Sequence, residues 1–531
     1  MSRPIPSRLL WIALDAAEPR LIERWTEDGS LPHLAALRER GAYGRLASSA
    51  HWLVGSPWPT FYTSTTPGDH GFYHYLGWSP HKMAAARPTP KTFPLTPFWR
   101  GLAKRGVRTF ALDIPLTYHP EPYDGVEING WATHEVLVAP GSHPPELWKT
   151  VVDRFGSPPI EAEAYALESP KRLLTMRDNL IAATGKVGDL GTWLMERQPW
   201  DLGLIGFCAT HRGGHKLWDL TNLDIEPDKQ ERAEIEDALR QVYIACDEAI
   251  GRLTQEAGDD ATVMVCSMHG MGPNTSRVEL LDEMLGRVLG RRPVPEAGAP
   301  SPASGGGTPG LSNRLRGLLP VAWRNAVKSR LPLSLQDRLT AFWRLKGLDY
   351  SQIEAFSLPA DLQGYIRFNL KGRESKGIVE PGEAVDALRR RIEAGLRSFI
   401  DERTGESVVE AVALTRELYP EGARLDALPD LLVRWSAEPV AETRRLRSPE
   451  FGAIDWPTPG RNVTGRSGNH RGEGFVIGAG PGFAPAQSLT DADILDLAPT
   501  VCALLGHAPP AEMKGRALVS PPDPNDLPTA R

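Results

Sequence analysis

Apolar runs and amphipathic stretches alternate along the first half of the chain. The apolar runs are short and bounded by polar residues, which is typical of strands that are buried on both faces. They lie at Leu9–Leu14, Arg108–Leu112, Leu202–Phe207 and Ala261–Cys266. The residues between them carry the helical period near Glu18–Arg40 and over Asp228–Glu256.

Strands that alternate with helices indicate a mainly parallel sheet covered on both faces. The predicted fold class is therefore α/β, a three-layer α/β/α sandwich with a central, mostly parallel sheet. Ligands of such sheets bind at the carboxyl ends of the strands. Residues that directly follow a predicted strand are thus the first candidates for a functional site.

The pattern changes after Asn274. Residues Arg291–Pro309 are rich in Pro, Gly, Ala and Ser, which is typical of a flexible linker. The basic stretch Leu311–Lys346 predicts a helical insertion. A solvated insertion is the favoured interpretation, and a surface for an anionic partner is the alternative. Strand-like patterning resumes at Ala355–Leu358, Gly364–Asn369, Asp430–Trp435 and Gly474–Gly478, and the amphipathic stretch Asp493–Leu505 closes the fold.

These boundaries predict one core that is interrupted by an insertion. Residues 7–274 form its first part, 275–350 the linker and the helical insertion, and 351–519 its second part. A Pro- and Asp-rich tail at 520–531 is expected to be disordered.

The composition limits the kinds of partner and the cellular compartment that we expect for this protein. A chain of 531 residues with a net charge of -6 gives no overall reason to expect nucleic acid or an anionic membrane as a partner. Its four cysteines form no CxxC pair, so we expect buried thiols rather than disulfides. No apolar stretch approaches the roughly 18 residues that a membrane span needs. We therefore expect a cytoplasmic protein, and a homodimer is compatible with the sequence.

Candidate chemistry lies directly after the predicted strands. Asp15 ends the first strand, and His269 follows the run Ala261–Cys266. His211 and His215 follow another strand at a spacing of four residues, which places both imidazoles on one helix face. His470, which precedes a strand, is a natural third ligand. Three histidines with an open position suit Zn²⁺.

The order of these segments resembles the alkaline phosphatase superfamily, in its type I phosphodiesterase/nucleotide pyrophosphatase branch. The resemblance spans nearly the whole chain outside about Thr275–Tyr350. It rests on a series of short motifs: Leu14-Asp15-Ala16, Leu31-Pro32-His33-Leu34, Ser56-Pro57-Trp58-Pro59-Thr60-Phe61, Thr66-Pro67-Gly68-Asp69-His70-Gly71, the His211–His215 block, Ser267–Gly272, Gly364–Asn369, His470 and Asp496-Leu497-Ala498-Pro499-Thr500.

The resemblance implies an alkaline phosphatase-like fold and a two-metal mechanism. One ion would be held by a strand-end Asp, a Ser or Thr nucleophile and an Asp-His pair, and the other by Asp, His and a later His. Position by position, Asp15 and His269 match the first site. His215 and His470 match the second site, and His211 stands at its Asp position.

This sequence departs from the family pattern at two ligands. Met268 and His211 stand where the family has Asp, so two carboxylates are missing from the metal cluster. A site of His211, His215 and His470 still suits Zn²⁺, with Mn²⁺ as the alternative, whereas a thioether is a poor ligand for either. We therefore expect one firmly bound divalent ion and a second that is weak or absent.

The predicted nucleophile is a hydroxyl near the start of a helix. Ser56 is the first choice and Thr60 the second. A count back from Thr63 instead places the family hydroxyl at Val54, which cannot attack. A helix N-cap is the competing interpretation of Ser56.

The remaining assignments concern the substrate. Trp58 is a candidate wall for its non-phosphate part, and Arg212 and Arg471 are candidate phosphate ligands. The predicted function is a metal-dependent hydrolase of phosphate esters that acts through a Ser/Thr phospho-enzyme on a small phosphorylated substrate. The alternative is a catalytically degenerate relative that binds a phosphorylated ligand without turnover.

Overall fold

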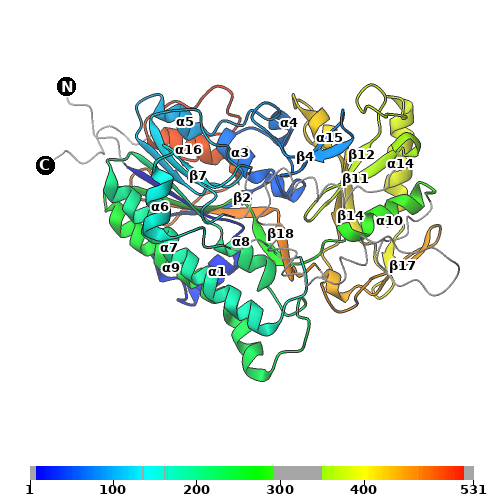
Figure 1. Cartoon of the computed structure of the whole chain (residues 1–531), viewed down its shortest axis with the longest axis horizontal. Coiled ribbons are helices and arrows are strands. Elements are labelled where there is room, and N and C mark those ends of the chain that lie inside the picture. The colour runs from blue at the N-terminus through cyan, green and yellow to red at the C-terminus, as the bar shows by residue number, and fades with distance from the viewer. Residues whose placement is uncertain are drawn as a thin grey trace.

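The computed structural model describes residues 8–133, 137–160, 163, 165–291, 350–462 and 464–519. Within them, a wide central sheet carries helices on both faces, and a smaller antiparallel sheet lies beside it (Figure 1). The predicted insertion Leu311–Lys346 and tail 520–531 lie outside the described residues, as does the predicted linker apart from Arg291.

The central sheet is mixed and mainly parallel. β1 pairs parallel to β8 and β9, and β5 pairs parallel to β8 and β6, whereas β19 and β7 run antiparallel to their neighbours. This confirms the predicted fold class. In spatial order the strands are β20 (Gln487–Ser488), β2 (Gly41–Ala47), β19 (Glu473–Ala479), β9 (Thr262–Ser267), β1 (Leu9–Leu14), β8 (Leu202–Phe207), β5 (Thr109–Leu112), β6 (Gly125–Asn129) and β7 (Gly141–His143), and β21 (Ala492–Asp493) pairs with β2.

The apolar runs are continuous because the sheet is covered on both faces. In β1, Leu10 and Ile12 pack into one apolar cluster, while Leu9 and Trp11 pack into the cluster on the other face. Successive side chains of a strand point to opposite faces, so a strand in the middle layer needs apolar residues at every position.

Two groups of helices supply the outer layers (Figure 1). The first face is covered by α1 (Pro19–Glu27), α2 (Pro32–Glu39), α6 (Leu147–Phe155), α7 (Pro170–Arg197) and α9 (Lys229–Ala257). The second is covered by α3 (Pro57–Thr63), α5 (Phe98–Ala103) and α16 (Leu497–Leu504). No helix in the described part of the chain is long and apolar enough to cross a membrane.

The prediction of one helix near Glu18–Arg40 was wrong. The segment forms α1 and α2, which are separated by a short turn. Gly29 in that turn has a φ of 82°, and Pro32 opens the second helix. A left-handed glycine ends the first helix, and a proline without an N–H is tolerated only at the start of the next.

The smaller sheet brings together strands from the second part of the chain. It contains β11 (Ala355–Leu358), β12 (Gly364–Phe368), β15 (Leu431–Trp435) and β14 (Val409–Leu414), with α10 (Val278–Val288) and α14 (Glu383–Arg397) packed in the same apolar cluster. Three further small sheets are β13 (Ile400–Asp401) with β16 (Arg445–Ser448) and β17 (Gly452–Asp455), β3 (Gly77–Ser79) with β4 (Ala84–Ala86), and β10 (Gly270–Pro273) with β18 (Gly468–Arg471). The short helices are α4 (Pro67–His70), α8 (Ala209–Lys216) and α15 (Thr415–Leu418), and the 3-10 turns are η1 (Ser49–His51), η2 (Tyr350–Gln352), η3 (Leu425–Ala427), η4 (Val440–Glu442) and η5 (Ile494–Asp496).

Candidate metal centre

A histidine cluster lies at the carboxyl edge of the central sheet. β1, β8 and β9 are neighbours in that sheet, so Asp15, helix α8 and His269 follow adjacent strand ends. β18 pairs with β10 and sets His470 opposite Met271. The topology thus brings together the predicted residues Asp15, His211, His215, His269 and His470, all of which are buried.

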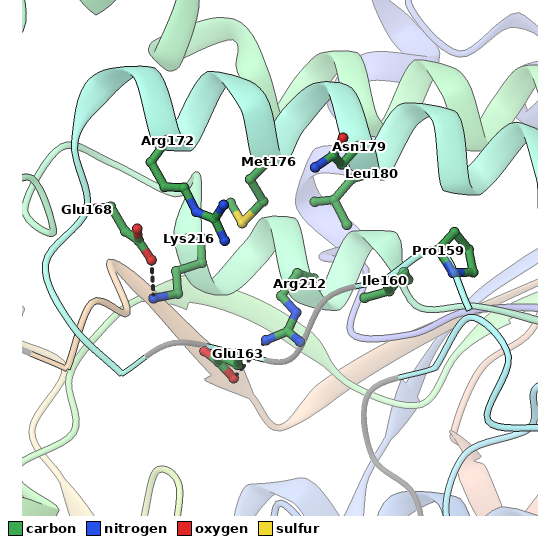
Figure 2. A pocket seen from close by; sticks show the side chains of 10 residues that line it. All are labelled: Pro159, Ile160, Glu163, Glu168, Arg172, Met176, Asn179, Leu180, Arg212 and Lys216. Carbon is green, nitrogen blue, oxygen red and sulfur yellow. Dashed lines mark hydrogen bonds and ion pairs between the residues drawn. The ribbon is translucent and has the colours of Figure 1, made fainter. Parts of the chain in front are cut away.

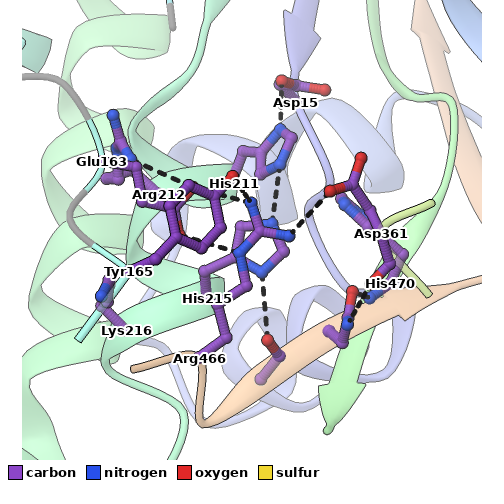
Figure 3. Close-up of polar contacts among 12 residues, drawn as sticks. Asp15, Glu163, Tyr165, His211, Arg212, His215, Lys216, Asp361, Arg466 and His470 are labelled. Carbon is purple, nitrogen blue, oxygen red and sulfur yellow. Dashed lines mark hydrogen bonds and ion pairs between the residues drawn. The ribbon is translucent and has the colours of Figure 1, made fainter. Parts of the chain in front are cut away.

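The two histidines of α8 face each other through their Nε2 atoms, which lie 3.0 Å apart. His211 Nδ1 lies 2.7 Å from Asp15 Oδ2, and His215 Nδ1 lies 3.0 Å from the Gly468 carbonyl oxygen (Figure 3). Both oxygens accept, so each ring carries its proton on Nδ1. The two Nε2 lone pairs then point at each other, an arrangement that a cation or a shared proton between them stabilises.

His470 completes a group of three imidazoles. Its ring centroid lies 4.8 Å from that of His211 and 4.8 Å from that of His215. One ligand nitrogen from each of the three lies within 4.8 Å of the others. His470 Nδ1 is buried and has no hydrogen-bond partner among the described residues. The same is true of Nδ1 of His269, whose ring stacks on His470 with the centroids 4.7 Å apart.

The protonation states suit metal binding. Burial lowers the pKa of His215 and of His470 well below the usual imidazole value, and the charge of Arg466 and the neighbouring histidines lower both further. Burial also lowers the pKa of His269 to about 4, although Asp15 opposes the shift. These imidazoles are therefore neutral near pH 7, as metal ligands must be.

Asp15 uses both carboxylate oxygens within the protein. Oδ2 accepts from His211, and Oδ1 accepts from Trp58 Nε1 at 3.0 Å. Burial alone would raise the pKa of Asp15, but the adjacent His211, which also donates a hydrogen bond to it, lowers the pKa overall. The predicted substrate residue Trp58 thus contacts the site as a hydrogen-bond donor to Asp15.

Two apolar residues, Met268 and Val54, stand at positions where the resemblance predicts a carboxylate and a hydroxyl. Met268 is buried in the same apolar cluster as Trp58. Val54 is buried, and its backbone N–H donates to Tyr365 Oη at 3.2 Å.

The two predicted nucleophiles make local hydrogen bonds. Ser56 Oγ lies 2.6 Å from the Leu53 carbonyl oxygen and 2.8 Å from Ser49 Oγ. Thr60 Oγ1 lies 3.0 Å from His70 Nε2, while His70 Nδ1 accepts from the Phe72 N–H. His70 therefore carries its proton on Nε2 and donates to Thr60, so this imidazole is unable to remove the hydroxyl proton in the tautomer present.

The predicted phosphate ligands Arg212 and Arg471 differ in their surroundings. Arg212 Nη1 lies 3.3 Å from the Glu163 carboxylate and lines a cavity of about 40 Å³ together with Glu168 and Lys216 (Figure 2). Arg471 donates to the carbonyl oxygens of His470 and Pro273. In the described part of the chain no carboxylate lies within ion-pair distance of Arg471.

Sequence reasoning missed a buried arginine beside the histidines (Figure 3). Arg466 donates to both Glu163 oxygens, at 2.9 and 2.7 Å, and lies 3.1 Å from Tyr165 Oη and 3.4 Å from Asp361. Arg466 lies close to His470 in the sequence, and this proximity could have marked it as a candidate site residue. Glu163 and Asp361 lie outside any periodic pattern, so nothing in the local sequence pointed to them.

Comparison with known proteins identifies the family. The family model described as type I phosphodiesterase / nucleotide pyrophosphatase matches residues 9–441. No curated protein gives a significant match. A crystal structure of phosphonoacetate hydrolase from Sinorhizobium meliloti 1021, in complex with phosphonoformate, is 13% identical with a TM-score of 0.50, covering 93% of this chain and 94% of that chain. Human ectonucleotide pyrophosphatase / phosphodiesterase 5 is 12% identical with a TM-score of 0.45, covering 95% and 96%.

At 13% identity the first likeness establishes the shared fold, and the family model carries the assignment. The predicted class of enzyme, a phosphoric ester hydrolase, is confirmed at the level of the family. Because the match covers most of the chain, the protein belongs to the type I phosphodiesterase/nucleotide pyrophosphatase family of the alkaline phosphatase superfamily.

Proposed function

We propose that this chain hydrolyses phosphate esters with one divalent ion held by His211, His215 and His470. The observation that carries the proposal is the pair of Nε2 atoms 3.0 Å apart, each on a ring whose proton is fixed on Nδ1. Without a cation or a shared proton, two lone pairs at that distance repel each other. Enzymes of this family are typically metal-dependent, which agrees with the proposal.

The donor set fits Zn²⁺ better than Mn²⁺. Three imidazoles with an open fourth position form a common catalytic zinc site, whereas Mn²⁺ prefers oxygen ligands. Ligand nitrogens about 2.0 Å from a tetrahedral ion lie roughly 3.3 Å apart, close to the His211–His215 distance. When bound, the ion would supply Lewis-acid polarisation of a phosphoryl oxygen.

Asp15 is proposed to position a metal ligand, His211, through a hydrogen bond. A carboxylate that accepts from Nδ1 of a metal-binding histidine fixes the tautomer and raises the basicity of the other ring nitrogen. Both Asp15 oxygens are already bonded, and Met268 lies in an apolar cluster, so the remaining family position offers His269 alone. These contacts support a single firmly bound ion.

Two groups are proposed to act on the substrate. Arg471, which follows His470 and has no carboxylate within ion-pair distance among the described residues, would bind the phosphate. Ser56 remains the proposed nucleophile, with Thr60 as the second candidate. Attack by Ser56 requires its hydroxyl to rotate away from the Leu53 carbonyl oxygen.

A ligand-binding relative without turnover is the second candidate function. Val54 at the expected hydroxyl position and Met268 in an apolar cluster favour it, because neither side chain can attack phosphorus or hold an ion as a carboxylate does.

Metal content and turnover test the proposal together. The purified protein should contain about one equivalent of zinc. His215→Ala should lose it and should lower turnover of bis-p-nitrophenyl phosphate and p-nitrophenyl phosphate at least a hundredfold. His81→Ala, a change of an exposed histidine, is the matched control and should leave both values unchanged.

A parallel comparison separates the two candidate functions. Ser56→Ala should abolish a trapped phospho-enzyme and turnover while one equivalent of zinc remains. Activity that persists in His215→Ala would refute the metal site. Zinc-loaded wild-type protein that binds phosphate and turns over neither ester would instead favour the binding protein.

A further inference from the structure

His470 of the histidine cluster lines an open pocket. This pocket, called the His470 pocket below, has a volume of about 190 Å³. The residues that line it and matter here are His51, Leu362, Gln363, Trp435, His470 and Arg471. His470 belongs to the proposed ion site, so a phosphate bound there would direct its ester group into this pocket.

A larger neighbouring pocket suits a phosphate ester less well. It measures about 360 Å³ and is lined by Arg466 but also by the acids Glu279, Asp282 and Asp361. Arg466 already pairs with Glu163. Carboxylates repel a phosphate dianion, and none of the proposed ion ligands lines that pocket.

The His470 pocket carries net positive charge at the phosphate side only. Arg471 uses two of its five N–H groups on backbone carbonyl oxygens, which leaves donors for a phosphate. On the rim, Arg434 pairs with Glu410 at 3.0 and 2.7 Å, so these two charges cancel. The rest of the ligand therefore meets no uncompensated charge in this pocket.

Gln363 adds a specific polar requirement. Its Nε2 donates to the carbonyl oxygens of Ala50 and His51, at 2.9 and 3.2 Å, which fixes the orientation of the amide. The side-chain oxygen is then a buried acceptor without a donor among the described residues. A buried acceptor is stabilised by a ligand that brings an O–H or N–H group to it.

The other walls of the His470 pocket limit the size and polarity of the ligand. The indole N–H of Trp435 donates to the Leu362 carbonyl oxygen, so Trp435 presents an apolar face to the ligand. The pocket is smaller than the roughly 300–1,000 Å³ of sites that hold drug-sized molecules. A phosphate with a three- or four-carbon alcohol suits this volume, whereas a nucleoside would extend beyond the pocket into solvent.

We infer that the substrate is a phosphoric ester of a small hydroxyl-bearing alcohol, bound with a hydroxyl of its alcohol part donating to Gln363 Oε1. The inference rests on the proposed function and adds the substrate class. It predicts that the protein distinguishes its ligands by one hydroxyl group of the alcohol part and that a nucleobase adds no affinity.

Calorimetry on the full-length, zinc-loaded protein tests it without turnover. The probes are inorganic phosphate, butylphosphonate, 3,4-dihydroxybutylphosphonate and the methylenephosphonate analogue of AMP, all of which lack a P–O ester bond. The dihydroxy compound should bind about tenfold more tightly than butylphosphonate. The AMP analogue should bind no more tightly than phosphate.

Gln363→Met should reduce the preference for the dihydroxy compound to about one, with zinc content unchanged. Equal binding of the two phosphonates by the wild type would overturn the inference even if the variant fails to fold. Tighter binding of the AMP analogue, or a preference that survives Gln363→Met in folded protein, would overturn it as well. If no probe binds, phosphate included, the proposed function fails together with it.

Discussion

At the scale of single residues, Asp15 contacts an imidazole of the histidine cluster. The Asp15 Oδ2 atom lies 2.7 Å from His211 Nδ1, so this carboxylate orients the imidazole. Trp58 holds the other carboxylate oxygen in place. The sequence predicted Asp15 and His211 in one site but assigned Trp58 to the substrate, because the hydrogen bond from Trp58 depends on side-chain orientations that only the packed structure defines.

His70 gives a residue-scale prediction about pH. Burial lowers its pKa to about 3. Between about pH 6.5 and 3 the unfolded chain therefore binds a proton that the native protein does not, and stability falls as the pH falls through this range. From pH 7.5 to 5.5 this one group should cost about 1.4 kcal/mol.

The free energy of unfolding of the wild type and its variants is measured by urea denaturation. A chelator is present, so that bound metal does not contribute. His70→Asn keeps an acceptor for the Phe72 N–H and does not titrate. Its stability should decline by about 1.4 kcal/mol less than that of the wild type over the same pH interval. His81→Asn should decline like the wild type. An equal decline of all three proteins would contradict a neutral His70 in the native state.

At the scale of elements, the proposed ion site depends on the close approach of α8 and β18. A Cβ atom on Gly468 would lie 2.1 Å from the Gly214 carbonyl oxygen. Such an approach is impossible for any residue with a side chain unless one element moves. Gly468 also supplies the carbonyl oxygen that fixes His215, so glycine at this position sets the geometry of two ligands.

Gly468→Ala should therefore separate His215 from His470. We expect a loss of about 1–3 kcal/mol in stability and at least a tenfold weaker affinity for zinc, measured by competition with a chelating dye. Gly185→Ala in α7 is the matched control, because a Cβ there meets nothing within 4 Å. It should raise stability by about 0.5–1 kcal/mol and leave zinc affinity unchanged. Unaltered zinc affinity in Gly468→Ala would refute the role of this contact.

At the scale of the whole molecule, one ion would connect distant parts of the chain. The ligands come from α8, which follows β8, and from β18, which precedes the antiparallel strand β19. Binding to the native state alone stabilises it by about 2.7 kcal/mol at a ligand concentration of 100 times Kd.

Zinc should accordingly raise the melting temperature of the chelator-treated protein by a few degrees. Magnesium should have little effect, because it prefers oxygen ligands. The shift should disappear in His470→Ala and persist in His81→Ala, as measured by calorimetry. A zinc-induced shift of equal size in His470→Ala would place the ion elsewhere.

The amino-acid sequence by itself determined the layer architecture and the family. Apolar runs such as Leu202–Phe207 coincide with observed strands, because burial on both faces demands apolar residues at every position. It also selected the histidines, since their types and spacing are local properties. The break between α1 and α2 is also encoded locally, by Gly29 and Pro32. The helical period alone does not reveal this break.

Only the tertiary structure decided how those residues are used. The proton positions on His211 and His215 follow from Asp15 and Gly468, and the burial of Met268 follows from the neighbouring helices. Arg466, Glu163 and Gln363 join the site or its pocket through contacts between segments far apart in sequence. Hydrogen bonds and Coulomb interactions act through space over a few ångströms, so they become defined only when the fold brings their partners together.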